Sequence, residues 1–251
     1  MNVNTYLNIY YVIIYMKKVI SFSLWGDKEV KHCSSNDYFI GAIKNANLAL
    51  KMYPGFECWF YVHKETVPQE IINKLSNISN TKIIYKTGDL NKIKPMTWRF
   101  ESIDHPDVEI NLSRDTDTRF LLREKLAVEE WMKSDKIFHI MRDHPHHSHP
   151  ILGGMFGIKK NTIIKSWKSL IDSKISQTRP RDYDSVFLQN IIYPLIFNNS
   201  LVHTSFKCYS REYVKPFPIP YCKDFYFVGG YVYHDDSVST NHTNILKKYI
   251  Q

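Results

Sequence analysis

Residues 108–119 carry the sequence VEINLSRDTDTR. The first five residues, 108–112, predict a short β-strand, and an acidic turn follows it directly. Asp115 and Asp117 lie one residue apart in this turn, so both carboxylates can face one cation. Carboxylate oxygens suit hard divalent ions such as Mg²⁺ or Mn²⁺, which keep open positions for phosphate oxygens. The turn therefore predicts a site where a divalent cation and a diphosphate meet.

Two arginines flank the acidic pair. Arg114 and Arg119 can each make bidentate contacts with an anion beside the metal. An alternative interpretation is a charged turn whose aspartates cap the following helix and pair with these arginines. The position of the turn at the end of a strand favours the metal site, if the surrounding chain forms an α/β sheet.

Strand and helix patterns alternate on both sides of the acidic turn. We expect strands at 19–24, 57–62, 81–85, 108–112, 136–141 and 154–158. We expect helices at 38–52, 68–75, 119–134, 161–175 and 184–197, the last kinked or ended by Pro194. This alternation predicts a single α/β domain with a mostly parallel central sheet and helices on both faces. Such sheets bind ligands at the carboxyl ends of their strands.

The composition is that of a folded globular protein. The 251 residues are 43% hydrophobic and 14% aromatic, which excludes a disordered chain, and nine Gly and eleven Pro exclude a collagen-like one. A formal net charge of +8 predicts an anionic partner without distinguishing nucleic acid, nucleotide and membrane. The four cysteines form no CxxC pair and no disulfide scaffold, which indicates a reducing compartment and a cytoplasmic location.

The N-terminal residues 6–16, YLNIYYVIIYM, are apolar. They have about half the length of a membrane-spanning helix and lack the features of a secretion signal. We expect residues 1–17 to form an extension or an extra strand before a catalytic domain at 18–251, with no stable transmembrane anchor. An interfacial anchor is the alternative.

Several blocks of the sequence together resemble a known family. They are WRF at 98–100, SRDTDTR at 113–119, LREKLAVEEW at 122–131, FHIMRDHPHH at 138–147 and ILGGMFGIK at 151–159. In this order they are similar to DxD glycosyltransferases with a Rossmann-like GT-A nucleotide-sugar fold, above all to a group of predicted sugar transferases from bacteria and large DNA viruses. The resemblance runs from about residue 19 to about residue 233.

The resemblance implies a reaction and a cofactor. In the family, the DxD carboxylates bind a divalent ion, usually Mn²⁺ and alternatively Mg²⁺, which contacts the diphosphate of a UDP- or GDP-sugar. The sugar passes to a hydroxyl group of a glycan, a protein or another acceptor. If the chain is viral, the implied location is the host cytoplasm.

The resemblance also implies roles for individual residues. It assigns Asp115 and Asp117 to the metal, and His203 to the completion of the metal shell, although a packed His hydrogen-bonded to backbone explains His203 equally well. We expect donor contacts from Ser23, Trp25, Trp98, Arg99, Arg114, Asp115, Arg142, His144, Gly153 and Gly154. The two glycines let the backbone approach a ligand closely, or simply form a tight turn.

Asp184 and Asp143 are the candidate catalytic carboxylates. Asp143 lies where the family places a carboxylate that faces the transferred sugar. Asp184 is our candidate for the base, although this chain has Asp-Ser where similar enzymes often have Asp-Gln, and Asp184 can instead be a helix N-cap. The histidines that follow Asp143 favour a solvated, pH-sensitive loop over a metal centre.

Two other functions remain open. A metal-dependent nuclease or phosphotransferase would also combine basic charge with paired aspartates. A basic nucleic-acid-binding protein is the non-enzymatic alternative. Its lysines and arginines would be aligned, whereas here they are scattered and no DNA- or RNA-reading motif is present, so we expect no nucleic-acid partner. The sequence leaves an oligomer possible.

Overall fold

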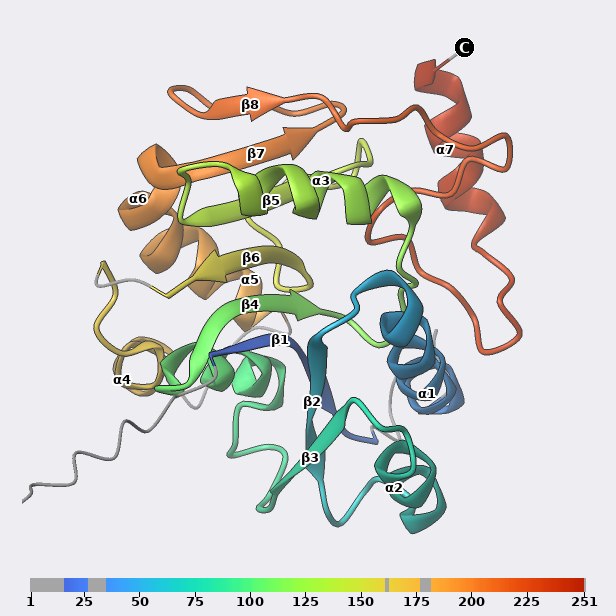
Figure 1. Ribbon diagram of the computed structural model, residues 1–251, viewed down its shortest axis with the longest axis vertical. Helices are drawn as coiled ribbons and strands as arrows, with labels where there is room; N and C mark the ends of the chain where they lie inside the picture. The colour runs from blue at the N-terminus through green and yellow to red at the C-terminus, as the bar shows by residue number, and fades with distance from the viewer. Residues whose placement is uncertain (1–15, 27–34, 161–162, 177–181, 251) are drawn as a thin grey trace, which may run out of the picture.

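A computed structural model describes residues 16–26, 35–160, 163–176 and 182–250. Its centre is an eight-stranded sheet with the order β3-β2-β1-β4-β6-β5-β7-β8 (Figure 1). The strands are β1 Lys17–Leu24, β2 Phe56–His63, β3 Thr81–Lys86, β4 Val108–Arg114, β5 Phe138–Arg142, β6 Met155–Lys159, β7 Ser200–Thr204 and β8 Tyr213–Lys215. β6 pairs antiparallel with both of its neighbours, and the other pairings between these strands are parallel.

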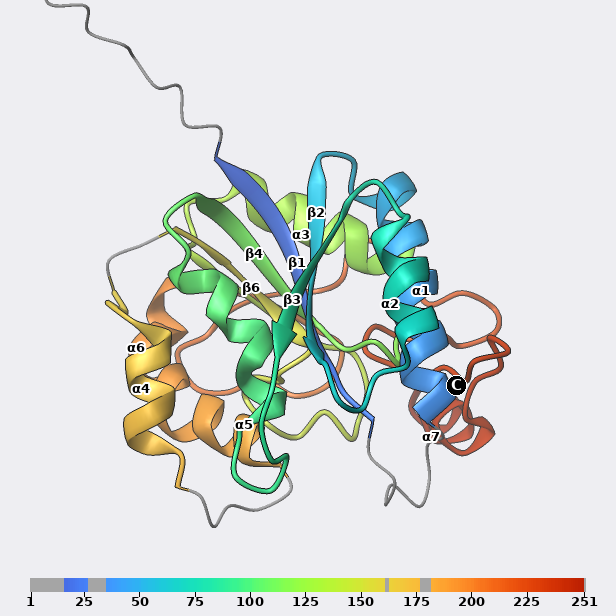
Figure 2. The same ribbon diagram turned by 90° about the horizontal axis from the view of Figure 1, so that it is seen from below.

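Helices cover both faces of the sheet (Figure 2). One face carries α1 Ser35–Met52, α2 Gln69–Ser76 and α3 Leu122–Lys133. The other carries the 3₁₀-helix η1 Pro95–Asp104, α4 Trp167–Lys174, α5 Tyr183–Phe187, the π-helical turn η2 Leu188–Ile192, α6 Tyr193–Ile196 and the short 3₁₀-helix η3 Phe197–Asn199. α7 Thr240–Ile250 ends the described chain beside the sheet. The expected Rossmann-like α/β class, with a mostly parallel sheet covered on both faces, is confirmed.

Aromatic side chains build a core on each face. On the α1–α3 face, the rings of Phe22 and Phe60 stack with their centroids 4.7 Å apart. On the other face, Phe156 of β6 stacks on Trp167 of α4 at 5.8 Å. Burying one such side chain contributes about 1.5–3 kcal/mol, so the two cores fix the sheet between its helices.

The reversed direction of β6 brings a turn to the carboxyl ends of the parallel strands. Arg114, at the end of β4, pairs with Met155, at the start of β6. The residues just before β6, Gly153 and Gly154, therefore lie at the same edge as the acidic turn after β4. The helix and strand pattern alone did not predict this reversal.

Several element boundaries differ from those expected. The helix expected at 119–134 begins at Leu122, and the one expected at 161–175 begins at Trp167. The helix expected at 184–197 is broken by the π-helical turn just before Pro194, which lacks the N–H that a continuous α-helix needs. We did not predict η1, β7, β8 or α7.

The prediction for residues 1–17 lies almost entirely outside the described residues, and Lys17 already belongs to β1. Among the helices that the structure describes, none has the length and apolar character needed to cross a membrane.

Candidate functional site

Three acidic or basic side chains meet at the carboxyl edge of the sheet. Arg99 comes from η1, Asp115 directly follows β4, and Asp184 lies in the first turn of α5. Nη2 of Arg99 donates to Oδ2 of Asp184 at 2.8 Å, and Nη1 pairs with the carboxylate of Asp115. Arg99 is buried and Asp184 is only 1% exposed. One guanidinium thus bridges two carboxylates that are 69 positions apart in the sequence (184 − 115).

Gly153 and Gly154 allow this cluster to form. A Cβ atom on Gly154 would lie 1.8 Å from Oδ2 of Asp115. A Cβ on Gly153 would lie 2.3 Å from Nη2 of Arg99 and 2.4 Å from Oδ2 of Asp184. The oxygen of Gly153 accepts a hydrogen bond from Oγ of Ser113 at 2.6 Å, which fixes the turn. We expected the backbone at these glycines to approach a ligand closely. In the structure it approaches the side chains of Arg99, Asp115 and Asp184.

Asp117 lies beside Asp115 in the acidic turn. Burial, and then the neighbouring charge of Asp115, raise the pKa of Asp117 to about 7. Its backbone oxygen accepts a hydrogen bond from the amide of Val232 at 2.8 Å. The charges of Arg99 and Arg119 act in the opposite direction and lower the pKa of Asp117.

The acidic turn is also anchored to α1. Nδ2 of Asn45 donates to the oxygens of Thr116 and Thr118, at 3.3 and 2.9 Å. Gly41 packs so closely on the turn that a Cβ there would lie 2.1 Å from the oxygen of Thr116. These contacts fix the backbone that presents both aspartates.

Asp184 has the electrostatics of a proton acceptor. Burial raises its pKa, the nearby charge of Asp115 raises it further, and the charge of Arg99 opposes both effects. The N-cap position of α5 belongs to Asp182, so the alternative role of Asp184 as an N-cap is wrong.

Near the end of β1, the predicted donor residues differ in exposure. Oγ of Ser23 accepts a hydrogen bond from the amide of Arg99 at 3.0 Å, so Ser23 is buried and positions η1. Trp98 is buried, and its ring lies between those of Trp25 and His63. The ring centroids are 6.3 Å apart for Trp25 and 6.0 Å apart for His63. Of these aromatic residues only Trp25 keeps an appreciable exposed surface. Trp98 and Ser23 therefore position the site and offer little surface to a ligand.

Arg114 is not available to bind an anion. β4 extends to Arg114, two residues further than expected, and the side chain points toward α3. There its Nε donates to Oε1 of Glu124 at 2.6 Å, and Nη1 donates to the oxygen of Phe156 at 2.9 Å. The predicted donor contact of Arg114 is not supported by this arrangement, because the side chain is buried and strand alternation places Asp115 and Arg114 on different sides.

Asp143 does not face a ligand either. It is fully buried, and Arg123 of α3 pairs with it at 3.0 Å. It also accepts hydrogen bonds from the hydroxyls of Ser205 and Tyr221, at 2.6 and 2.7 Å, and from the amide of Val228 at 2.9 Å. Its oxygens are therefore occupied by protein donors, and the catalytic role that we expected for Asp143 is not supported by this arrangement.

The residues around Asp143 are occupied in the same way. Arg142 is buried and pairs with Glu212, and its Nη1 also donates to the oxygen of Pro150. His144 is buried, stacks on Phe227 with ring centroids 4.4 Å apart, and its pKa is lowered by burial. Neither predicted donor contact is supported, because both side chains bind the later part of the chain.

His203 lies in a separate network on β7. Its Nδ1 is 2.8 Å from Nε2 of His139, and its Nε2 is 3.1 Å from the carboxylate of Glu130. Both ring nitrogens therefore have protein partners, His139 and Glu130, and the predicted metal contact of His203 is not supported by this arrangement. No group of three or more candidate metal ligands (His, Cys, Asp, Glu) occurs within residues 16–26, 35–160, 163–176 and 182–250.

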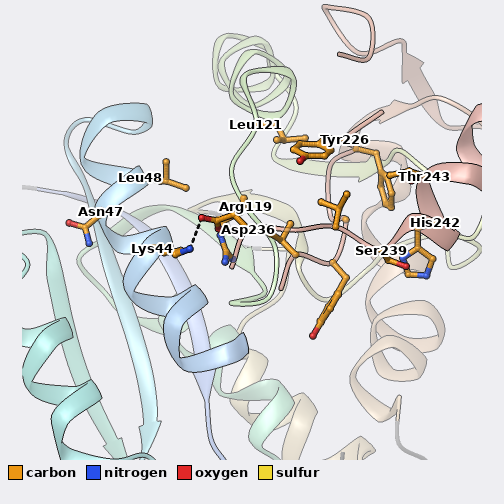
Figure 3. A pocket seen from close by; sticks show the side chains of 15 residues that line it. Lys44, Asn47, Leu48, Arg119, Leu121, Tyr226, Asp236, Ser239, His242 and Thr243 are labelled. Atoms are coloured by element: carbon orange, nitrogen blue, oxygen red, sulfur yellow. Dashed lines mark hydrogen bonds and ion pairs between the residues drawn. The ribbon is translucent and has the colours of Figure 1, made fainter. Parts of the chain in front are cut away.

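A pocket of about 440 Å³ lies next to the acidic turn (Figure 3). Its walls come from α1, from residues 119–121 before α3, and from residues 226–243 at the C-terminal end. No local sequence pattern predicted this pocket, since its walls join segments almost 200 positions apart.

Comparisons with known proteins add a likeness of fold only. No family model and no curated protein matches the chain. One similar solved structure is 4-diphosphocytidyl-2C-methyl-D-erythritol synthase from Anaerococcus prevotii, at 13% identity and a TM-score of 0.46, covering 76% of this chain and 90% of that one. Another is a glycosyltransferase involved in the glycosylation of the major capsid of PBCV-1, at 14% identity and a TM-score of 0.46, covering 75% and 82%. At this level of similarity neither activity transfers to the chain.

Proposed function

We propose that the chain is a metal-dependent glycosyltransferase, which moves a sugar from a UDP- or GDP-sugar to a hydroxyl group of an acceptor. The observation that carries the proposal is the cluster of Asp115, Asp117, Asp184 and Arg99 at the carboxyl edge of a mostly parallel sheet. Ligands of such sheets bind at this edge. The resemblance of the sequence to DxD glycosyltransferases supports the same assignment.

The residues present fit a divalent cation. Asp115 and Asp117 are hard oxygen ligands, and the pKa of Asp117 is raised by burial and then by the neighbouring charge of Asp115. Mg²⁺ and Mn²⁺ are commonly bound by one or two carboxylates, with the other positions left to water and phosphate oxygens. When bound, such an ion stabilises the charge that develops on the leaving diphosphate.

The protein side chains supply the remaining chemistry. Asp184 accepts the proton of the acceptor hydroxyl as its oxygen bonds to the anomeric carbon of the sugar and the nucleoside diphosphate departs. The raised pKa of Asp184 suits this role. Arg99 orients both Asp115 and Asp184, so it sets the geometry between the leaving group and the base. Trp25 is the residue available to stack on the nucleotide base.

A thermal-shift screen tests the proposal. UDP- and GDP-sugars are added to the protein with and without Mn²⁺, and donor hydrolysis and transfer are then measured for the best ligand. We expect stabilisation that requires both donor and metal, since a ligand that binds the folded state raises its stability. Cleavage of labelled DNA, with no response to any nucleotide sugar, would support the nuclease alternative.

Asp117→Ala separates the metal site from the fold. We expect activity to fall by about 10³-fold or more, because electrostatic stabilisation of the leaving group is worth several kcal/mol. Asp172→Ala, at an exposed aspartate on α4, is the matched control and should keep wild-type activity. Wild-type turnover in Asp117→Ala, or in excess chelator, would contradict the proposal.

A further inference from the structure

The pocket beside the acidic turn is mainly apolar. It lies between α1, the start of α3 and the C-terminal residues 226–243, and Figure 3 shows side chains from these elements directed toward one space. Its apolar walls are formed by Leu48, Leu121, Tyr226, Phe227, Val232 and Val238. A volume of about 440 Å³ with such walls is typical of small-molecule sites.

Two cations of the pocket, Lys44 and Arg119, share one carboxylate, that of Asp236. Nζ of Lys44 pairs with Oδ2 of Asp236, and Nε of Arg119 pairs with Oδ1 of the same carboxylate at 3.1 Å (Figure 3). Lys44 also donates to the oxygen of His234 at 2.8 Å, and Arg119 donates to the oxygen of Thr118 at 2.9 Å. Both cations therefore have protein partners, and most of the remaining pocket wall is apolar.

The pocket and the acidic turn share a wall. Val232 lines the pocket and donates its amide hydrogen to the backbone oxygen of Asp117. Arg119 lines the pocket only two residues after Asp117. A ligand seated in the pocket consequently lies against the same backbone that presents the metal-binding carboxylates.

We propose that this pocket binds an uncharged apolar group, a short alkyl chain or a single aromatic ring, that is carried by the hydroxyl-bearing acceptor. The identification of this ligand as an acceptor rests on the proposed glycosyltransferase function. A nucleotide sugar consists of a charged diphosphate, two sugars and a polar base, none of which matches the apolar side chains that form most of the wall. An acceptor with an apolar part matches them, and its hydroxyl extends toward the acidic turn.

Titration calorimetry with two probes tests the proposal, without donor or metal. Hexyl β-glucoside carries an alkyl chain, and methyl β-glucoside carries the same sugar without it. We expect the wild type to bind the hexyl probe at least tenfold more tightly. Leu48→Trp should abolish this preference by filling the pocket, whereas Leu50→Trp, at an exposed position of the same helix outside the pocket, should retain it.

A second variant covers the possibility that Leu48→Trp fails to fold, which thermal unfolding would reveal. Asn47 also lines the pocket and is exposed on α1, so Asn47→Trp fills the space without disturbing the core. Equal affinity of the wild type for both probes, or a hexyl preference that survives in the folded pocket variants, would overturn the proposal. Loss of donor hydrolysis reports on the proposed function alone, because neither donor nor metal enters the titration.

Discussion

At the scale of single residues, the site depends on how closely backbone and side chains approach one another. Gly154 has no Cβ, and this alone lets the carboxylate of Asp115 lie against the turn before β6. Arg99 then reaches both Asp115 and Asp184. The position of the Asp115 carboxylate therefore depends on a residue with no side chain.

Gly154→Ala should reduce activity while leaving most of the stability. The added methyl group would displace the Asp115 carboxylate, and a misplacement of about 1 Å in a catalytic group costs on the order of 10²-fold in rate. Activity and the urea midpoint are measured on the same preparation.

Gly157→Ala is the matched comparison. A Cβ at Gly157 would lie 2.9 Å from Leu112 and 3.0 Å from Trp131, in the core and away from the acidic turn. We expect a loss of about 1–3 kcal/mol in stability from overpacking, with activity per folded molecule unchanged. The interpretation of Gly154 fails if the two variants lose activity equally.

The local sequence pattern predicted which residues lie at the strand ends, but it did not predict their long-range partners. Asp115, Asp117 and Asp184 were predicted because each lies just after a strand or at the start of a helix, a position that the local pattern reveals. Asp143 also follows a strand, but its partner Arg123 lies on a helix 20 positions earlier. No local sequence pattern predicts this ion pair. Long-range partners thus decide whether a charged residue is free to bind a ligand.

At the scale of elements, residues 226–234, here called the crossing segment, connect the two halves of the sheet edge. The amide of Val228 donates to Asp143 beyond β5, and that of Val232 donates to the oxygen of Asp117 beyond β4. Further on, His234 contacts Asp37 of α1 through its amide at 2.8 Å. The crossing segment therefore contributes to the walls of the site without forming a helix or strand of its own.

Asp143→Asn should destabilise the protein and free the crossing segment. It removes the charge that pairs with buried Arg123, and breaking a buried pair costs about 3–5 kcal/mol. Urea unfolding measures the loss, and hydrogen exchange at the amide of Val228 reports the local effect.

Glu129→Gln serves as the control for Asp143→Asn. Glu129 pairs with Lys125 on the exposed side of α3 at 3.1 Å, and such surface pairs are worth about 0.5 kcal/mol or less. Unchanged stability and exchange in Asp143→Asn would show that the ion pair does not anchor the crossing segment.

The long elements were predictable because their hydrophobic patterns are strong. The strands at 57–62 and 81–85 were expected within one residue of their bounds. By contrast, β8 has three residues, and η1 has no clear period, so neither produces a pattern that sequence alone can separate from a loop. The direction of β6 was not predicted either, because the residue pattern of a strand is the same whether it pairs parallel or antiparallel.

At the scale of the whole molecule, buried histidines make stability depend on pH. Burial lowers the pKa of His139, His144, His147 and His203, and that of His147 falls to about 3. Below a pH of about 6.5 the unfolded chain binds protons that these folded histidines do not bind, so their contribution to stability falls as the pH falls. The contribution is complete only above that pH.

His147→Asn should reduce this pH dependence. The Nδ1 atom of His147 accepts a hydrogen bond from the amide of Asp143 at 3.0 Å, which an Asn oxygen can also accept. Between pH 7 and pH 5 the wild type should lose about 1 kcal/mol more than the variant, a value reduced for the partial exposure of the ring. Urea titrations at several pH values measure the difference, and parallel curves for the two proteins would refute it.

The antiparallel pairing of β5 and β6 has a consequence for diversification. The chain leaves the sheet after Arg142 and returns at Met155 on the same side, so residues 143–154 form a loop whose two ends adjoin. Lengthening a loop of this kind costs little, about 0.6 kcal/mol for each doubling, and it shifts no strand register. Insertions beside the exposed His146 and Ser148, between the buried Asp143 and the tightly packed Gly153 and Gly154, would change the outer part of the loop and spare its anchors, which makes that part a target for engineering a new specificity.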